Sequence, residues 1–94
     1  MKNPKFYALL DKIKALHDKK NNDYATGQDP FSNFRECEKL GIPAWKGCLV
    51  RMGDKWARIN NLVGKQANNE PIEDSLLDLA VYSTICLLLR EEKK

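Results

Sequence analysis

Residues 76–89 read Leu-Leu-Asp-Leu-Ala-Val-Tyr-Ser-Thr-Ile-Cys-Leu-Leu-Leu, and this stretch decides the fold. Its apolar side chains lie nearly all round a helix, so a helix here must be covered on every side. The apolar run from Leu79 to Leu89 is too short to span a bilayer, which takes roughly 20 residues. We therefore predict a central helix, beginning at about Ile72, in an all-α bundle that is completed by oligomerisation.

Apolar residues at helical spacing predict two further long helices. The first begins at Asn3, which can cap it, has Pro4 at its first position and runs to about Lys20. The second runs from Pro43 to about Val63. The residues expected to face the core from this second helix are Trp45, Cys48, Leu49, Met52, Trp56, Ile59 and Val63.

The connections are predicted from turn formers and from short apolar patterns. Residues 21–30 predict a loop. A short helix follows, with an apolar side and a closing Gly41; the apolar side consists of Phe31, Phe34, Cys37 and Leu40. The predicted architecture is three long helices and one short helix in a single domain, residues 1–94.

Composition limits the possible functions. Sixteen Lys and Arg against 13 Asp and Glu leave a net charge of +3, too little to argue for binding of duplex nucleic acid. Three widely spaced cysteines and one histidine argue against zinc and against a disulfide framework, so reduced thiols in a cytoplasmic protein are expected. No signal peptide is visible and no membrane partner is expected.

Charged residues recur on one face of the second long helix. Arg51, Asp54 and Arg58 fall at i, i+3 and i+7, which places them together. A solvated face with internal ion pairs is the simplest explanation.

Asp78 lies deep in the apolar last helix. A buried carboxylate needs a partner, a metal or a proton, and the cations available for it are Arg51, Lys55 and Arg58. Asp74 and Tyr82 share its edge of the helix.

Polar residues also gather outside the long helices. Lys20, Asn21, Asp23 and Tyr24 could contact a phosphate, a ribose and a base, or could form a solvated turn. Asn33 lies between two phenylalanines and is therefore expected close to the packed side.

Four blocks resemble those of small phage and prophage proteins described as a nucleotide-modification-associated domain, which are similar in turn to MazG-like all-α nucleoside triphosphate pyrophosphohydrolases. The blocks are Lys20-Asn21-Asn22-Asp23-Tyr24, Asp29-Pro30-Phe31-Ser32-Asn33-Phe34, Arg51-Met52-Gly53-Asp54-Lys55-Trp56-Ala57-Arg58 and Glu73-Asp74-Ser75-Leu76-Leu77-Asp78-Leu79-Ala80-Val81-Tyr82. The resemblance covers residues 6–90. It implies an all-α nucleotide site in a protein of an infected or lysogenic bacterial cell.

The MazG pattern holds Mg²⁺ with four carboxylates, and this chain departs from it at two of them. Arg51 and Ser75 stand where the pattern has glutamate, so the resemblance leaves Asp54 and Asp78, with Asp74 as a partial replacement, as the candidate Mg²⁺ ligands. An arginine in place of a ligand shifts the site towards binding phosphate directly.

Three functions follow as hypotheses. The first is a nucleotide binder that requires no cofactor and could sequester a nucleotide signal of host defence. Its candidate ligand-binding residues are Lys20, Asn21, Asp23, Tyr24, Asn33, Phe34, Trp45, Arg51, Lys55, Arg58 and Tyr82. The second is a Mg²⁺-dependent pyrophosphohydrolase of (deoxy)nucleoside triphosphates, with Asp54, Asp74 and Asp78 as ligands. The third is a structural or adaptor bundle whose ion pairs fix the helix register.

Overall fold

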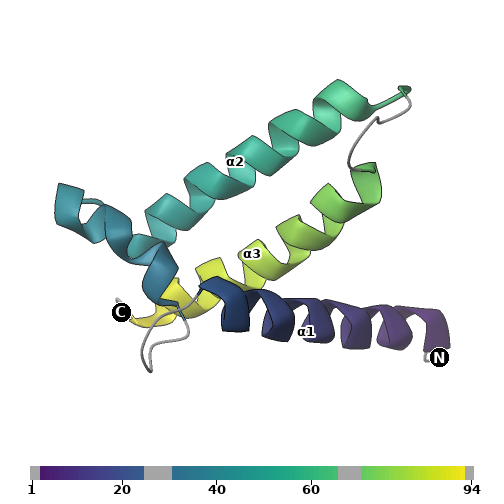
Figure 1. Ribbon diagram of the computed structural model, residues 1–94, viewed down its shortest axis with the longest axis horizontal. Coiled ribbons are helices and arrows are strands. Elements are labelled where there is room, and N and C mark those ends of the chain that lie inside the picture. Colours follow the sequence, from purple (N-terminus) through teal and green to yellow (C-terminus); the bar gives the residue numbers. More distant parts are fainter. Residues whose placement is uncertain (1–2, 25–30, 66–70, 93–94) are drawn as a thin grey trace. The chain divides into compact units, whose positions relative to one another are not determined.

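The computed structural model describes residues 3–24, 31–65 and 71–92, and the side chains of residues 20–24 lie outside that description. Within these ranges the chain forms helices and no strand (Figure 1). The elements are α1 (Pro4–Tyr24), η1 (Ser32–Phe34), η2 (Glu36–Leu40), α2 (Ala44–Leu62) and α3 (Ile72–Glu92), where η marks a 3₁₀ helix. The all-α prediction, with three long helices and a short helical segment between the first two, is confirmed. The chain divides into two compact units, Met1–Asn33 and Phe34–Lys94.

Helix α1 begins as its sequence predicts. The Asn3 side chain accepts hydrogen bonds from the backbone N–H groups of Lys5 and Phe6, at 3.0 and 3.3 Å. The predicted end at Lys20 was wrong, since the helix continues to Tyr24. Asn and Asp lower helix propensity by only a few tenths of a kcal/mol each, and no proline or glycine stands between Pro4 and Gly27.

The predicted short helix consists of two 3₁₀ segments, η1 and η2. The apolar positions 31, 34, 37 and 40 repeat every three residues, which is the period of a 3₁₀ helix. Gly41 ends η2 with a φ of 79°, and its N–H bonds back into the last turn, as predicted for a glycine in this place. Leu40 was expected on the packed side but is 80% exposed.

Helices α2 and α3 pack as an antiparallel hairpin (Figure 1). Three contacts between the helices define the register. The Cys86 thiol donates to the Trp45 carbonyl, the Cys48 thiol donates to the Tyr82 carbonyl, and Lys55 pairs with Asp78. As the residue number rises along α2 it falls along α3.

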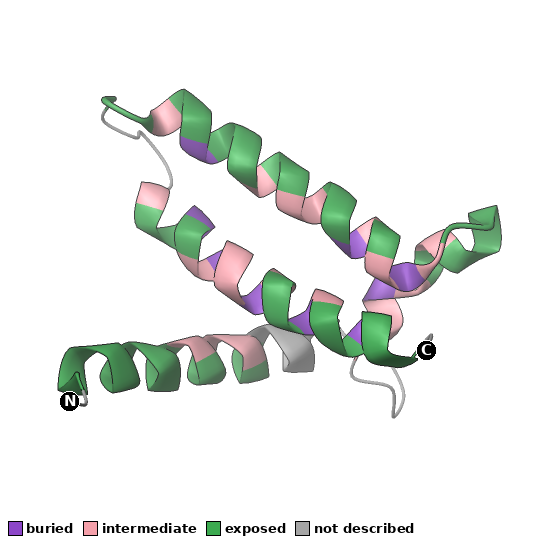
Figure 2. Ribbon diagram, turned by 180° about the vertical axis from the view of Figure 1, so that it is seen from behind, coloured by how far each residue is buried: buried purple, intermediate pink, exposed green. Residues whose placement is uncertain are grey.

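The buried residues follow the seam between these two helices (Figure 2). The apolar core among the described residues consists of Phe34, Ala44, Cys48, Ile59, Val81, Ile85 and Leu89. Leu49, Trp56 and Val63 were predicted to face the core, but they are 45, 57 and 62% exposed. Helix α3 covers only a narrow stripe of α2, and these residues lie beside that stripe.

Helix α3 is likewise buried on one side only, not all round. Leu76 and Leu87 are 51 and 60% exposed. No helix in the described part of the chain has the length and apolar character needed to cross a membrane.

Candidate functional site

The centre of the candidate site is an ion pair between α2 and α3. The Lys55 Nζ lies 2.9 Å from an Asp78 carboxylate oxygen, and the two side chains are 23 and 6% exposed. The sequence predicted that Asp78 needs a partner and offered three cations, and the structure shows Lys55 in that role. Removing one member would leave the other charge in a poorly solvated place, which is strongly unfavourable.

One turn of α2 away, Arg51 lies over an aromatic pair. Its guanidinium carbon is 4.7 Å from the centre of the Phe34 ring, within cation–π range. The Phe34 ring in turn meets the Tyr82 ring edge to face, with centroids 5.7 Å apart and planes at 78°. The structure thus brings together a cation from α2, a ring from η1 and a ring from α3, all three of which were predicted site residues.

Two thiols join the helices beneath this group. The Cys48 Sγ lies 3.3 Å from the Tyr82 carbonyl oxygen, and the Cys86 Sγ lies 3.5 Å from that of Trp45. Burial raises the pKa of the Cys48 thiol to about 11, with a further contribution from Cys86, while the Arg51 charge lowers it. Cys48 therefore stays protonated at neutral pH and acts as a donor in the helix interface, not as a nucleophile.

Ser75 adds a polar atom on the same stripe of α3, one turn before Asp78. It is fully buried, and its Oγ makes no hydrogen bond with the described residues. A buried hydroxyl without a partner is unfavourable by about 1–3 kcal/mol. Sequence reasoning considered Ser75 only as a missing ligand and did not predict its burial.

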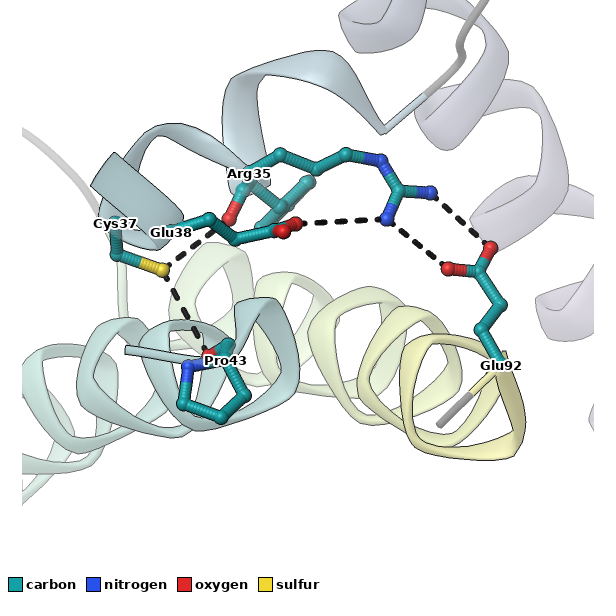
Figure 3. A network of polar contacts seen from close by, with 6 residues as sticks. Arg35, Cys37, Glu38, Pro43 and Glu92 are labelled. Atoms are coloured by element: carbon teal, nitrogen blue, oxygen red, sulfur yellow. Dashed lines mark hydrogen bonds and ion pairs between the residues drawn. The ribbon is translucent and has the colours of Figure 1, made fainter. Parts of the chain in front are cut away.

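A salt bridge holds the chain next to Phe34 (Figure 3). Arg35 donates from both guanidinium NH₂ groups to the two carboxylate oxygens of Glu92, at 3.0 and 3.1 Å, and lies 3.8 Å from Glu38. This fork ties the residue after Phe34 to the last turn of α3. This salt bridge could not be predicted from the sequence, because Glu92 lies in a charged tail that is typical of a solvated end.

Trp45 engages other partners. The guanidinium of Arg90 lies 4.4 Å from its ring centre, and the Lys46 ammonium lies 5.5 Å away. The ring also forms one wall of an open surface cavity of about 360 Å³, whose other lining residues are Glu38, Gly41, Ile42 and Pro43. Trp45 was predicted to stack a base, but its ring contacts Arg90 and Lys46, whereas the Arg51 guanidinium lies on Phe34.

The remaining predicted residues are dispersed. Asp54, Arg58 and Asp74 are exposed on their helices, and no three His, Cys, Asp or Glu side chains in the described ranges are grouped as a metal site would need. Asn33 is half-buried and belongs to the unit Met1–Asn33. The side chains of Lys20, Asn21, Asp23 and Tyr24 lie outside the described residues.

Comparison with known proteins gives no relative. No family model, curated protein or solved structure matches the chain. The helices alone define the fold class as all-α. The resemblance to the MazG-like proteins stays a prediction, because no comparison tests it.

Proposed function

We propose that the chain binds a nucleotide through its phosphates on the face shared by α2 and α3, without efficient hydrolysis. The observation that carries the proposal is the grouping of Arg51 over Phe34 and Tyr82 beside the Lys55–Asp78 pair. In an infected cell, such a binder sequesters a nucleotide signal of host defence.

The cations of α2 suit a phosphate chain. Arg51, Lys55 and Arg58 occupy positions i, i+4 and i+7, so they line about two turns of one helix face. Arg51 is half-buried, and a partly desolvated cation binds phosphate more strongly than one in bulk water. The charge of Lys55 is already balanced by Asp78, so Lys55 adds a hydrogen-bond donor and little net charge. Arginine also offers a planar fork that matches two phosphate oxygens.

Aromatic rings beside these cations suit a base. Phe34 is fixed from two sides, by Tyr82 and by the adjacent Arg35–Glu92 fork. Phe34 is buried and the Arg51 guanidinium lies over its ring, so a base stacks on this ring only when Arg51 turns away to a phosphate. Stacking of this kind contributes about 1–3 kcal/mol per base.

Mg²⁺-dependent pyrophosphate hydrolysis is less favoured by this geometry. Asp78 is the one buried carboxylate in the described ranges, and Lys55 already neutralises it. A metal at Asp78 would have to displace that ammonium, at the cost of leaving Lys55 beside a dication. A purely structural bundle explains the Lys55–Asp78 pair and the packing of Arg51 on Phe34, and the nucleotide panel separates it from the binder.

The test is to incubate the purified full-length chain with a panel of mono-, di-, tri- and cyclic nucleotides, with and without Mg²⁺. Bound material is separated by gel filtration, released by heat and identified by mass spectrometry. Intact nucleotide retained without Mg²⁺ supports the proposal. Monophosphate and pyrophosphate formed only with Mg²⁺ would establish the hydrolase instead, and no retention of any nucleotide would favour the structural bundle.

A further inference from the structure

Two of the three cysteines lie in the same layer of the α2–α3 interface. The Cys48 Sγ is 3.3 Å from the Tyr82 carbonyl oxygen, and in an α-helix this oxygen accepts the backbone N–H of Cys86, four residues further on. The Cys86 Sγ is 3.5 Å from the Trp45 carbonyl oxygen, which in the same way accepts the N–H of Leu49, the residue after Cys48. Each thiol therefore lies beside the backbone of the other cysteine.

The two thiols also interact with each other. Burial raises the pKa of the Cys48 thiol, and a hydrogen bond with the Cys86 side chain is among the further causes. Cys48 is fully buried, Cys86 is half-buried, and both are free thiols. They form a pair of soft sulfur donors inside the interface, which an ion can enter from the half-exposed side of Cys86.

The donor set selects the class of ion. Zinc sites in proteins use three or four side-chain ligands, and the described residues contain no group of three His, Cys, Asp or Glu side chains. The other polar groups within reach of the thiols are the carbonyl oxygens of Tyr82 and Trp45, which are hard donors and suit ions such as Mg²⁺. Two thiolates without a further side-chain ligand suit a soft monovalent ion that accepts two ligands in a line, and Cu⁺ is the biological ion of this class.

We propose that Cys48 and Cys86 bind one Cu⁺ ion as a pair of thiolates between α2 and α3. On binding, two S–H bonds break, two copper–sulfur bonds form and two protons pass to the solvent, with no change of oxidation state. The carbonyl groups of Tyr82 and Trp45 lose their thiol donors but keep their N–H partners within the helices, so no buried acceptor is left without a partner.

Arg51 offsets the charge of the metal-bound site. One Cu⁺ and two thiolates carry a net charge of −1, which is unfavourable in a buried place without a cation nearby. Burial raises the pKa of the Cys48 thiol, whereas the Arg51 charge lowers it. The same arginine therefore stabilises the thiolate form that the ion requires.

Anaerobic titration of the reduced full chain with Cu⁺, in competition with a coloured Cu⁺ chelator, tests the proposal. One Cu⁺ per chain is expected, with two protons released to a pH indicator. Cys48→Ser and Cys86→Ser should each weaken binding by at least about 100-fold, because loss of a residue that only orients a ligand already weakens metal binding by about 10–100-fold. Cys37→Ala is the matched control, since Cys37 is also a free thiol but donates to the carbonyls of Phe34 and Pro43; this variant should bind as the unmodified chain does.

Failure of the unmodified chain to withdraw Cu⁺ from the chelator would overturn the proposal, as would unchanged affinity of Cys86→Ser or loss of binding by Cys37→Ala. Because Cys86 is half-buried, Cys86→Ser provides the test if circular dichroism shows that Cys48→Ser does not fold. X-ray absorption at the copper edge should show two sulfur neighbours, and a third sulfur or a nitrogen would contradict the two-coordinate site. The titration contains no nucleotide, so its outcome is independent of the nucleotide proposal.

Discussion

At the scale of single residues, Asp78 is the only charged residue that is buried in the described part of the chain, with 4% of its surface exposed. Its neighbours on the same stripe of α3 are apolar or, in Ser75, a hydroxyl. Because the Asp78 carboxylate is buried, it needs a close cation, and the Lys55 Nζ lies 2.9 Å from it with the Lys55 side chain only 23% exposed. This ion pair contributes to the packing of α2 against α3 and also sets the charge next to Arg51 in the candidate site.

We expect Asp78→Ala to lower the free energy of unfolding by about 3 kcal/mol, because Lys55 would keep a partly buried charge without a partner. The double variant Lys55→Met/Asp78→Leu should recover most of that loss. Urea denaturation followed by circular dichroism measures both. The control is Glu36→Ala, which breaks the exposed Lys39–Glu36 pair and should leave the urea midpoint unchanged. Equal small effects at both sites would mean that the buried pair is solvated.

Ser75→Ala should leave the stability unchanged or raise it by up to about 1 kcal/mol, because the buried Oγ has no hydrogen-bond partner among the described residues. The same denaturation series provides the measurement. A loss of stability would contradict this expectation and would show that the hydroxyl is hydrogen-bonded in solution.

The raised pKa of Cys48 gives the stability a dependence on alkaline pH. The thiol pKa rises from an ordinary 9.0 to about 11 on folding, so the unfolded chain loses this proton first. The contribution to stability is present below pH 9 and is lost as the pH rises through about 11. Since lysines and tyrosines titrate in the same range, the test is the difference between the unmodified protein and Cys48→Ala. Parallel stability curves between pH 8 and 11 would contradict the assignment.

At the scale of the elements, η2 packs closely against α2 at Gly47. A Cβ atom at Gly47 would lie 2.5 Å from the Cys37 Sγ. The Cys37 Sγ lies 3.6 and 3.7 Å from the carbonyl oxygens of Phe34 and Pro43 (Figure 3), and so it is held against Gly47. This contact joins the segment that carries Phe34 to the first turns of α2.

Gly47→Ala should destabilise the fold by about 1 kcal/mol, since overpacking of about 1–3 kcal/mol outweighs the gain of up to about 1 kcal/mol in helix propensity. Adding Cys37→Ala removes the obstructing sulfur and should make Gly47→Ala neutral or favourable. Thermal denaturation of the two single variants and the double variant completes the cycle. An additive outcome would mean that the two residues are not in contact.

The long helices could be predicted from sequence because each has an independent signal. Asn3 and Pro4 mark the start of α1, and the acids Glu73 and Asp74 mark the start of α3, where the helix dipole favours them. The end of α1 was predicted too early, because the turn formers Asn21, Asn22 and Asp23 are tolerated in a helix that no proline or glycine interrupts there. The short helix was predicted without its division into two 3₁₀ segments, although its apolar positions repeat every three residues.

The site could be predicted only in part, because a residue list does not determine pairing. Asp78 needed a cation, but the choice among Arg51, Lys55 and Arg58 depends on the register of α2 against α3. The Arg35–Glu92 fork joins residues 57 positions apart, and neither end carries a local signal. The exposure of Trp56 depends on how many helices cover α2, which spacing along one helix cannot reveal.

At the scale of the whole molecule, the hairpin of α2 and α3 has two different surfaces. One carries the cations Arg51 and Arg58, and the other carries exposed uncharged residues, among them Leu49, Val50 and Trp56. A small chain buries a limited fraction of its surface, and this one leaves large apolar residues exposed on both helices.

Calorimetric titration tests the central claim, that the Arg51 group binds a nucleotide phosphate, using the nucleotide that the unmodified protein retains. Arg51→Gln should weaken binding by at least ~30-fold, the effect of losing about 2 kcal/mol at a charge-assisted contact, with the fold intact by circular dichroism. Lys39→Gln removes an exposed cation from η2 and should bind as the unmodified protein does. Unchanged affinity of a folded Arg51→Gln variant would contradict the account.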